Sequence, residues 1–363
     1  MLNRLRTAHF VIPFALILLS LLGCSKDKGP AKPGAVELVW SPLGSGMNSR
    51  VEALAVYNGQ LIAGGLFTIA GGSSANHVAA WNGNSWSQLG PGMEDYVSAI
   101  YGLTEWDGQL IAGGYFTTAG SGSANRVAAW NGNSWSPLGT GLDNTVFALG
   151  KFNGQLIATG LFDTAGGNPA AGIATWNGSS WAPLGSGLFP PGGYALTEFD
   201  AHLIAGGTFT NAGGVNASRI AAWNGSSWAP LGPGTKSRVE ALAVYNGHLI
   251  AGGHFTAEVG GPADFIAAWN GSSWGPLGSG MNNIVYALAI YDRKLIAGGD
   301  FTIAGGDSAN HIAAWDGSSW SALGSGVNGP VDALAVYNGR LIAGGLFTKA
   351  GGASVNNIAA LSN

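Results

Sequence analysis

The fold is decided by residues 51–89, which read VEALAVYNGQLIAGGLFTIAGGSSANHVAAWNGNSWSQL. Val51–Tyr57 and Gln60–Phe67 are short apolar runs of strand-forming residues on either side of Asn58-Gly59. Two such runs around an Asn-Gly pair predict a β-hairpin with a two-residue turn. A second Asn-Gly pair separates two further short runs at the end of the segment. The segment therefore predicts four antiparallel strands, and no part of the repeat has the apolar spacing of a helix.

The segment recurs along the chain with a nearly constant period. Its last tryptophan has equivalents at successive spacings of 46, 49, 46, 47, 46 and 46 residues. These tryptophans are Trp40, Trp86, Trp135, Trp181, Trp228, Trp274 and Trp320. The period is that of β-propeller blades and exceeds that of leucine-rich or ankyrin repeats. We therefore expect residues 38–363 to form one all-β domain, a seven-bladed β-propeller of four-stranded antiparallel blades.

The two ends of the repeat region complement each other. The last unit stops at Ile358–Leu361, a third strand with no tryptophan-containing strand after it. Val39–Leu43 is a fourth strand with no third strand before it. Pairing these segments would complete the last blade and leave no unpaired edge, whereas an open solenoid would need capping repeats. We expect a ring closed by the N-terminal strand.

Two tryptophans flank the second turn of the unit. A two-residue turn at Asn82-Gly83 would place Trp86 opposite Ala79 and diagonal to Trp81, on the same face of the sheet. We interpret these pairs as residues that pack between blades rather than residues that stack on a ligand.

The start of the chain predicts export. Arg4 and Arg6 precede Phe10–Leu22, an apolar run of thirteen residues. This run is too short for a membrane-spanning helix, which needs roughly 20 residues. Residues 1–23 are therefore predicted to be a signal peptide.

The apolar run ends in Leu-Leu-Gly followed by Cys24, the only cysteine of the chain. This string resembles the lipobox of bacterial lipoproteins, which implies cleavage before Cys24, acylation of that cysteine, and a lipid-anchored protein of the bacterial cell envelope. Cys24 is followed by Ser25 rather than by an aspartate, which resembles the pattern that sorts such proteins to the outer membrane if the cell is Gram-negative. The alternative is a plain signal peptide with an incidental cysteine. Residues 24–37 are predicted to be the lipidated cysteine and a flexible tether, because they are rich in charged residues, Pro and Gly.

The repeat itself also has a family resemblance. Six units end their second strand in Gly-Gly, as in Gly64-Gly65, and an aromatic residue is closely followed by a tryptophan, as in Trp81 and Trp86. These features resemble the kelch repeat, with a shorter spacing between the two aromatic residues and with Thr159-Gly160 in the third unit. The string Trp-Asn-Gly-Ser-Ser-Trp also resembles repeats of the fungal cortical polarity-marker family and of bacterial surface proteins. The resemblance covers residues 38–361 and implies the fold alone, because propellers serve binding, scaffolding and catalysis alike.

Composition excludes or disfavours several function classes. The formal net charge is −4 and no cluster of Lys and Arg is present, so we expect no nucleic-acid partner. Galactose oxidase also carries a kelch-type propeller, and that resemblance would imply a Tyr–Cys crosslink and a copper site, which a lone lipobox cysteine excludes. The histidines beyond the signal do not share metal-ligand spacing; they are His77, His202, His248, His254 and His311. We expect no metal, no cofactor, no catalytic residue and a monomeric protein.

Positions that differ between units are the candidate site residues, because positions identical in every unit serve packing that all blades share. Strand alternation places the loops between blades and the loops between second and third strands on one face, opposite the tight turns. We expect this loop-rich face to bind a protein or glycan ligand through aromatic and polar side chains. The candidates are Tyr96, Tyr115, Phe147, Phe189, His254 and Tyr286.

The second residue of each innermost strand also varies between units. The expected residues are Glu52, Ser98, Phe147, Glu240, Tyr286 and Asp332, with a departure from the pattern at Gly193-Tyr194 in the fourth unit. We expect Glu52, Glu240 and Asp332 to lie at one mouth of the axial channel.

The preferred hypothesis is a non-catalytic cell-envelope lipoprotein that binds protein or glycan. The alternatives are a polysaccharide hydrolase or lyase that uses these three acids, and a structural surface spacer with no specific ligand.

Overall fold

The computed structural model of the chain describes residues 38–94, 98–255 and 264–362, all within one compact unit, Glu37–Asn363. Every regular element in these ranges is a β-strand, which confirms the all-β prediction, and none of them contains a helix that could cross a membrane. The predicted signal peptide (1–23), Cys24, the rest of the tether (24–37) and Tyr96 lie outside the described residues.

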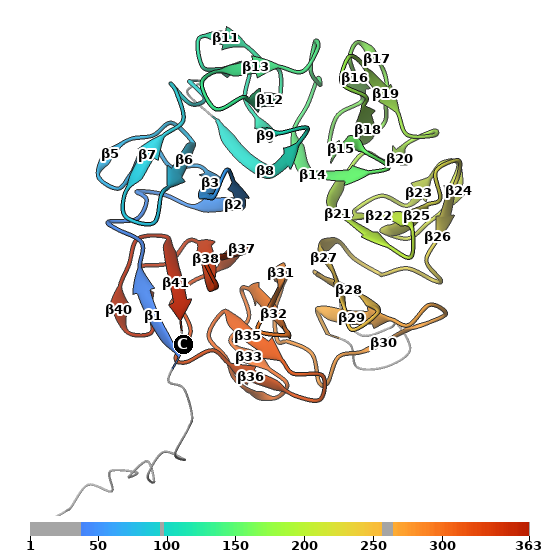
Figure 1. Cartoon of the computed structure of the whole chain (residues 1–363). Helices are drawn as coiled ribbons and strands as arrows, with labels where there is room; N and C mark the ends of the chain where they lie inside the picture. The colour runs from blue at the N-terminus through green and yellow to red at the C-terminus, as the bar shows by residue number, and fades with distance from the viewer. Residues whose placement is uncertain (1–37, 95–97, 256–263, 363) are drawn as a thin grey trace, which may run out of the picture. The chain divides into compact units, whose positions relative to one another are not determined.

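The described strands include seven four-stranded antiparallel sheets, which we number by chain order from the first to the seventh. The strands of each sheet nearest the common centre in Figure 1, the innermost strands, are β2 (Val51–Tyr57), β8 (Ala99–Trp106), β14 (Val146–Phe152), β21 (Gly193–Phe199), β27 (Val239–Tyr245), β31 (Val285–Tyr291) and β37 (Val331–Tyr337). The second strands are β3 (Gln60–Gly65), β9 (Gln109–Tyr115), β15 (Gln155–Gly160), β22 (His202–Gly207), β28 (His248–Gly253), β32 (Lys294–Gly299) and β38 (Arg340–Gly345).

The outer half of each sheet consists of two shorter strands. The third strands are β6 (Val78–Trp81), β12 (Val127–Trp130), β18 (Ile173–Trp176), β25 (Ile220–Trp223), β29 (Ile266–Trp269), β35 (Ile312–Trp315) and β41 (Ile358–Ser362). The fourth strands are β7 (Trp86–Gln88), β13 (Trp135–Pro137), β19 (Trp181–Pro183), β26 (Trp228–Pro230), β30 (Trp274–Pro276), β36 (Trp320–Ala322) and β1 (Val39–Pro42).

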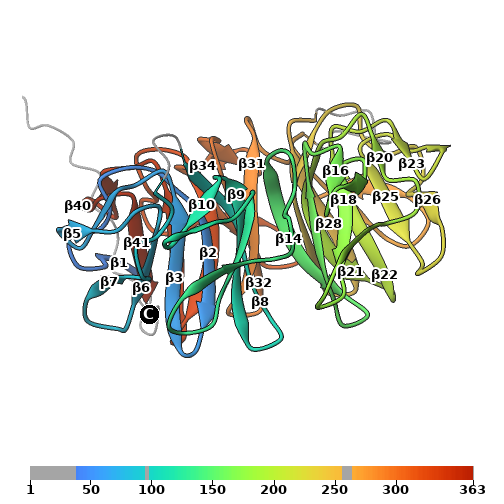
Figure 2. The ribbon, with the colours of Figure 1, turned by 90° about the horizontal axis from the view of Figure 1, so that it is seen from above.

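Short hairpins occupy the loops between second and third strands. They are β4 (Ile69–Ala70) with β5 (Ser73–Ser74), β10 (Thr118–Ala119) with β11 (Gly122–Ser123), β16 (Thr164–Ala165) with β17 (Asn168–Pro169), β23 (Asn211–Ala212) with β24 (Val215–Asn216), β33 (Ile303–Ala304) with β34 (Asp307–Ser308), and β39 (Lys349–Ala350) with β40 (Ala353–Ser354). One strand of a loop between sheets, β20 (Leu188–Phe189), pairs with β23. In Figure 2 the hairpins β10, β16 and β34 lie on one side of the unit, and the turns after β2, β8 and β21 lie on the other.

The sheets follow one another around a common centre (Figure 1). Each innermost strand contacts the innermost strand of the next sheet, and β37 contacts β2. The seventh sheet is built from both ends of the described chain, because β1 pairs antiparallel with β41 and places Trp40 beside Leu361. This arrangement of radial four-stranded sheets is that of a β-propeller.

The first turn of the unit has the predicted geometry and the second does not. Asn58 and Gly59 have φ of 47° and 70°, the left-handed values of a type I′ hairpin turn. In the second turn the backbone amide of Asn82 donates to the carbonyl of Ser85, and the Asn82 side-chain oxygen accepts from the amides of Asn84 and Ser85. The Asn82 side chain therefore stabilises a four-residue turn instead of a two-residue one.

The longer turn corrects the predicted tryptophan register. Trp81 pairs directly with Trp86, and Ala79 pairs with Gln88 rather than with Trp86. The two indole rings have centroids 5.3 Å apart at an interplanar angle of 45°. Both side chains are buried, so the pair packs inside the unit as expected.

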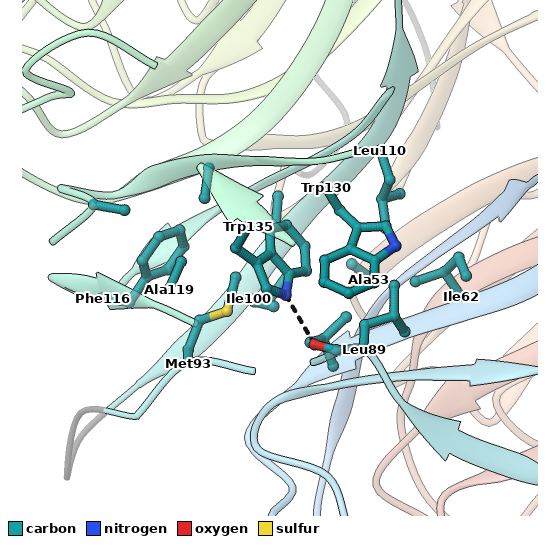
Figure 3. Packing of buried hydrophobic residues seen from close by; sticks show 14 of the residues in the cluster. Ala53, Ile62, Leu89, Met93, Ile100, Leu110, Phe116, Ala119, Trp130 and Trp135 are labelled. Atoms are coloured by element: carbon teal, nitrogen blue, oxygen red, sulfur yellow. Dashed lines mark hydrogen bonds between the residues drawn. The ribbon is translucent and has the colours of Figure 1, made fainter. Parts of the chain in front are cut away.

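Each fourth-strand tryptophan also joins two sheets. In Figure 3, Trp135 of the second sheet donates its indole N–H to the carbonyl of Leu89, at the end of the first sheet, over 2.9 Å. Met93 and Phe116 pack beside it in the same buried cluster. Trp40 makes the equivalent bond to the carbonyl of Leu323, 283 residues away in the chain, over 3.0 Å. The remaining bonds of this type come from Trp86, Trp181, Trp228, Trp274 and Trp320.

The two units that depart from the repeat compensate each other. In the second sheet Gly113 faces Val146 of the next sheet, and a Cβ on Gly113 would lie 2.7 Å from a Val146 methyl carbon. In the third sheet the glycine is replaced by Thr159, and in the fourth sheet the valine is replaced by Gly193. A Cβ on Gly193 would overlap the Thr159 hydroxyl, which is fully buried and donates to the carbonyl of Gly172 over 2.6 Å. Thr159 therefore fills the space that Gly193 leaves.

Candidate functional site

Each innermost strand contains a β-bulge near its start. In β2 the pairing with β3 shifts between Val51 and Ala53, so Glu52 has no partner across the sheet. The same shift occurs in all seven sheets, and the bulged residues are Glu52, Tyr101, Phe147, Tyr194, Glu240, Tyr286 and Asp332. Bulges re-aim side chains and are frequent beside functional sites.

The bulged residues line one central cavity of about 550 Å³. Arg50 and Arg238, each two residues before a bulge, also line it. The rest of the lining consists of Ala, Gly and Leu residues of the innermost strands. The bulges are at the ends of the innermost strands that lie away from the tight turns, so this central cavity opens toward the loop-rich face.

The sequence predicted five of the bulged residues, and the structure adds Tyr101 and Tyr194. Ser98 was expected in the second sheet and lies instead before β8, because the additional residues of this longer unit precede Ile100, the equivalent of Val51. In the fourth sheet the bulge places Tyr194 in the central cavity although Gly193 replaces the usual valine.

An arginine bridges two acids where the seventh sheet meets the first. Arg50 donates from Nε and Nη2 to the two carboxylate oxygens of Asp332, over 2.7 and 2.6 Å, and its Nε lies 3.3 Å from Glu52 Oε1. Burial raises the pKa of Glu52 to about 7, the charges of Asp332 and Glu240 raise it as well, and Arg50 lowers it. Burial also raises the pKa of Asp332, against the hydrogen bond and charge of Arg50. Glu52 is therefore an acid that titrates near neutral pH.

A second arginine pairs with the third acid of the central cavity. Arg238 forms an ion pair with Glu240, and its guanidinium carbon lies 4.9 Å from the ring centroid of Tyr194. Burial raises the pKa of Glu240, and Arg238 opposes that shift. Burial likewise raises the pKa of Tyr286, the bulged residue between Glu240 and Asp332.

An aromatic wall faces these acids. Phe147 stacks on Tyr194 with ring centroids 4.4 Å apart and an interplanar angle of 13°. Tyr101 contacts Phe147 edge-on, with centroids 5.4 Å apart. One side of the central cavity is thus aromatic, over the second to fourth sheets, and the other holds the three acids together with Tyr286.

The other predicted site residues lie around the central cavity rather than in it. Tyr115 is 42% exposed and carries the Arg126 guanidinium 4.6 Å from its ring centroid. Phe189 in β20 is 66% exposed, and His254 directly follows β28 and is exposed. The candidate set therefore divides into Phe147 and Tyr286, which line the cavity with the three acids, and Tyr115, Phe189 and His254, which do not line it.

Several polar loop residues serve the fold. The side-chain oxygen of Asn48 accepts hydrogen bonds from the backbone amides of Thr68 and Ile69, and so ties the loop between sheets to the adjacent hairpin loop. Asp143, Asn282 and Asn328 make the same pair of bonds. Within the described residues no group of three His, Cys, Asp or Glu side chains is placed to hold a metal ion.

Comparisons with known proteins support the fold. A family model described as a beta-propeller domain of unknown function (DUF5122) matches residues 107–128. No functionally curated protein matches the chain significantly. Many solved structures are similar to this chain, and three of them illustrate the range. The computationally designed Ika8 protein has 17% identity and a TM-score of 0.52, with 89% of this chain and 99% of that chain covered. The WD40 beta propeller domain of Doa1 has 13% identity and a TM-score of 0.57, with 89% and 96% covered.

The third similar structure is the extracellular domain of BT4673 from B. thetaiotaomicron, with 11% identity, a TM-score of 0.55, and 88% of this chain and 39% of that chain covered. Identities this low carry information on the fold alone. The chain is an all-β protein with a β-propeller fold, as the repeat predicted.

Proposed function

We propose that this chain is a non-catalytic, lipid-anchored protein of the bacterial cell envelope that binds protein or glycan through its loop-rich face, at the central cavity. One observation carries the proposal. The sheets are nearly identical in sequence, yet their bulged positions hold only acidic and aromatic side chains, and all of them line one cavity. Packing would favour the same residue in every sheet, so the variation at the bulges serves a ligand.

We further propose that the seven sheets are kelch-like blades of a closed ring. Closure is supported by the pairing of β1 with β41, by the Trp40–Leu323 hydrogen bond and by the contact between β37 and β2. The lipid anchor is supported by the lipobox-like string before Cys24. A tether that leads to β1 would join the outer edge of the seventh sheet, away from the central cavity.

A hydrolase or lyase acting on polysaccharide is the second candidate. Glu52 has a pKa near 7, so it can hold and release a proton at neutral pH as a general acid does. The two hydrogen bonds from Arg50 hold the carboxylate of Asp332 in place. Turnover of a polysaccharide panel that disappears in Glu52→Gln would establish this candidate. Turnover that survives replacement of Glu52, Glu240 and Asp332 would exclude these acids.

The test of binding compares two positions of the propeller. The full chain, Phe147→Ala and Ile290→Ala are probed with a glycan array and with capture from envelope extracts. Phe147 lines the central cavity, whereas Ile290 is exposed near the tight turn of β31. We expect a ligand that the full chain and Ile290→Ala retain and Phe147→Ala loses. A blank result on both assays would instead indicate a structural spacer.

A further inference from the structure

The charges of the central cavity balance only while one of its acids holds a proton. Three carboxyl groups and two guanidinium groups line it. Arg238 is engaged by Glu240 and by the ring of Tyr194. Arg50 gives both of its hydrogen bonds to Asp332 and reaches Glu52 only through Nε at 3.3 Å. Among the described residues no further hydrogen-bond donor or cation contacts the Glu52 carboxylate, so the cavity can accept one more positive charge there.

The surroundings of Glu52 suit the stem of a long basic side chain. The next innermost strand carries Tyr101, the edge of the aromatic wall. Leu103 of that strand packs toward Gly64 of the first sheet, and Leu54 packs toward Gly344 of the seventh, so apolar lining lies on both sides of Glu52. Lysine and arginine lay their methylene chains along apolar surface while the charged end meets an acid. A cavity of about 550 Å³ is ample for one such side chain.

The rim of the cavity carries three leucines and Tyr115, whose ring has the Arg126 guanidinium over it. The residues that directly follow the second strands of the seventh, first and third sheets are Leu346, Leu66 and Leu161, which are 50%, 41% and 37% exposed. The backbone amide of Leu66 donates to the carbonyl of Arg50, which places this rim beside the charged residues. Sugars stack on open aromatic faces, but Phe147 and Arg238 already contact the ring of Tyr194. A rim that is mostly leucine favours an apolar protein surface.

We propose that the central cavity is a socket for one lysine or arginine side chain of a protein partner, with Glu52 as its counter-ion and with Leu346, Leu66, Tyr115 and Leu161 as the surface on which the partner rests. This inference rests on the proposed binding function and names the ligand class of the same site. An ammonium group at Glu52 takes the place of the proton that this acid otherwise holds near neutral pH, in the field of Arg50, Asp332, Glu240 and Tyr101.

The experiment measures the binding of small probes to the full chain by ligand-observed NMR. The probes are Nα-acetyl-lysine amide, its neutral norleucine analogue, and glucosamine. The protein variants are Glu52→Gln and the control Glu198→Gln, an exposed acid near the tight turn of β21. We expect the lysine probe to bind at least about tenfold more tightly than the norleucine probe, and Glu52→Gln alone to remove that preference. The affinity of the unsubstituted chain for the lysine probe should rise about tenfold from pH 6 to pH 8, as Glu52 ionises.

Three results would overturn the inference: equal binding of the lysine and norleucine probes, an unchanged preference in Glu52→Gln, or binding of glucosamine but not of the lysine probe. The last result would identify an amino-sugar ligand instead. The proposed function fails separately, if Phe147→Ala leaves every captured ligand in place.

Discussion

Replacement of Trp40 by alanine tests whether the N-terminal strand closes the propeller. Trp40 is 4% exposed, lies beside Leu361 and donates its indole N–H to the carbonyl of Leu323. If β1 is an integral part of the seventh sheet, Trp40 contributes to stability as an internal tryptophan does. Trp135 of the second sheet, 9% exposed and bonded to the carbonyl of Leu89, is the matched reference.

The expected cost follows from the burial and the hydrogen bond. Replacing a buried tryptophan by alanine costs about 3–5 kcal/mol. The carbonyl of Leu323 is left without its partner, which adds about 1 kcal/mol. We therefore expect Trp40→Ala and Trp135→Ala to lower the free energy of unfolding by similar amounts, about 4–6 kcal/mol each.

The assay is urea denaturation of the full chain followed by circular dichroism. Both variants should shift the midpoint to lower urea by a similar amount, and Trp40→Phe, which keeps most of the ring, should shift it less. An unchanged midpoint for Trp40→Ala together with a large shift for Trp135→Ala would refute closure by β1, because it would mean that β1 can detach at no cost.

Three further predictions concern pH, packing and the anchor. The pKa of Glu52 is raised from 4.5 in the unfolded chain to about 7 in the fold, so the free energy of unfolding should fall by up to roughly 3 kcal/mol as pH rises from 4.5 through 7. Glu52→Gln should remove this loss. Its denaturation midpoint should equal that of the parent at pH 4 and exceed it at pH 8. An equal midpoint at both pH values would contradict the assigned burial of Glu52. Gly193→Val and Thr159→Gly should each destabilise the fold by about 1–3 kcal/mol, and the double variant, which restores the pair found in the other sheets, should recover at least half of the combined loss; additive losses would be the contrary result. Cys24→Ser should move the protein from the membrane to the soluble fraction after ultracentrifugation, and retention in the membrane fraction would exclude the lipobox interpretation.

The sequence predicted the fold well because the same pattern of apolar runs and turns recurs in every unit. Each Asn-Gly turn and each apolar run is supported by its equivalents in the other units, so the all-β propeller follows from periodicity alone. The error at the second turn had a local cause. The Asn82 side chain accepts two backbone amides and lengthens the turn, which a dipeptide pattern does not reveal.

The candidate site was predicted only in part. Five bulged residues were recognised as variable positions, but the bulge itself is a property of strand pairing and not of residue type. Tyr101 was missed because the longer second unit shifts the alignment, and Tyr194 was missed because Gly193 masks the repeat. The exchange of bulk between Thr159 and Gly193 is a signal that could have corrected the fourth unit. The ion pairs of Arg50 and Arg238 could not be predicted from the sequence. Arg50 pairs with a residue of another sheet, and Arg238 pairs with a bulged residue whose orientation depends on the strand pairing.

Site-specific photocrosslinking tests the central claim, that the bulged residues form the ligand-binding site, most directly. A benzophenone amino acid replaces either Tyr286 or Ile290, two residues of β31 that lie at the central cavity and near the opposite, tight-turn end. Irradiation in envelope extract should give one discrete adduct from position 286 that excess unlabelled full chain competes away, and none from position 290. Adducts from position 290 alone would contradict the account and would place the binding surface on the other face of the propeller.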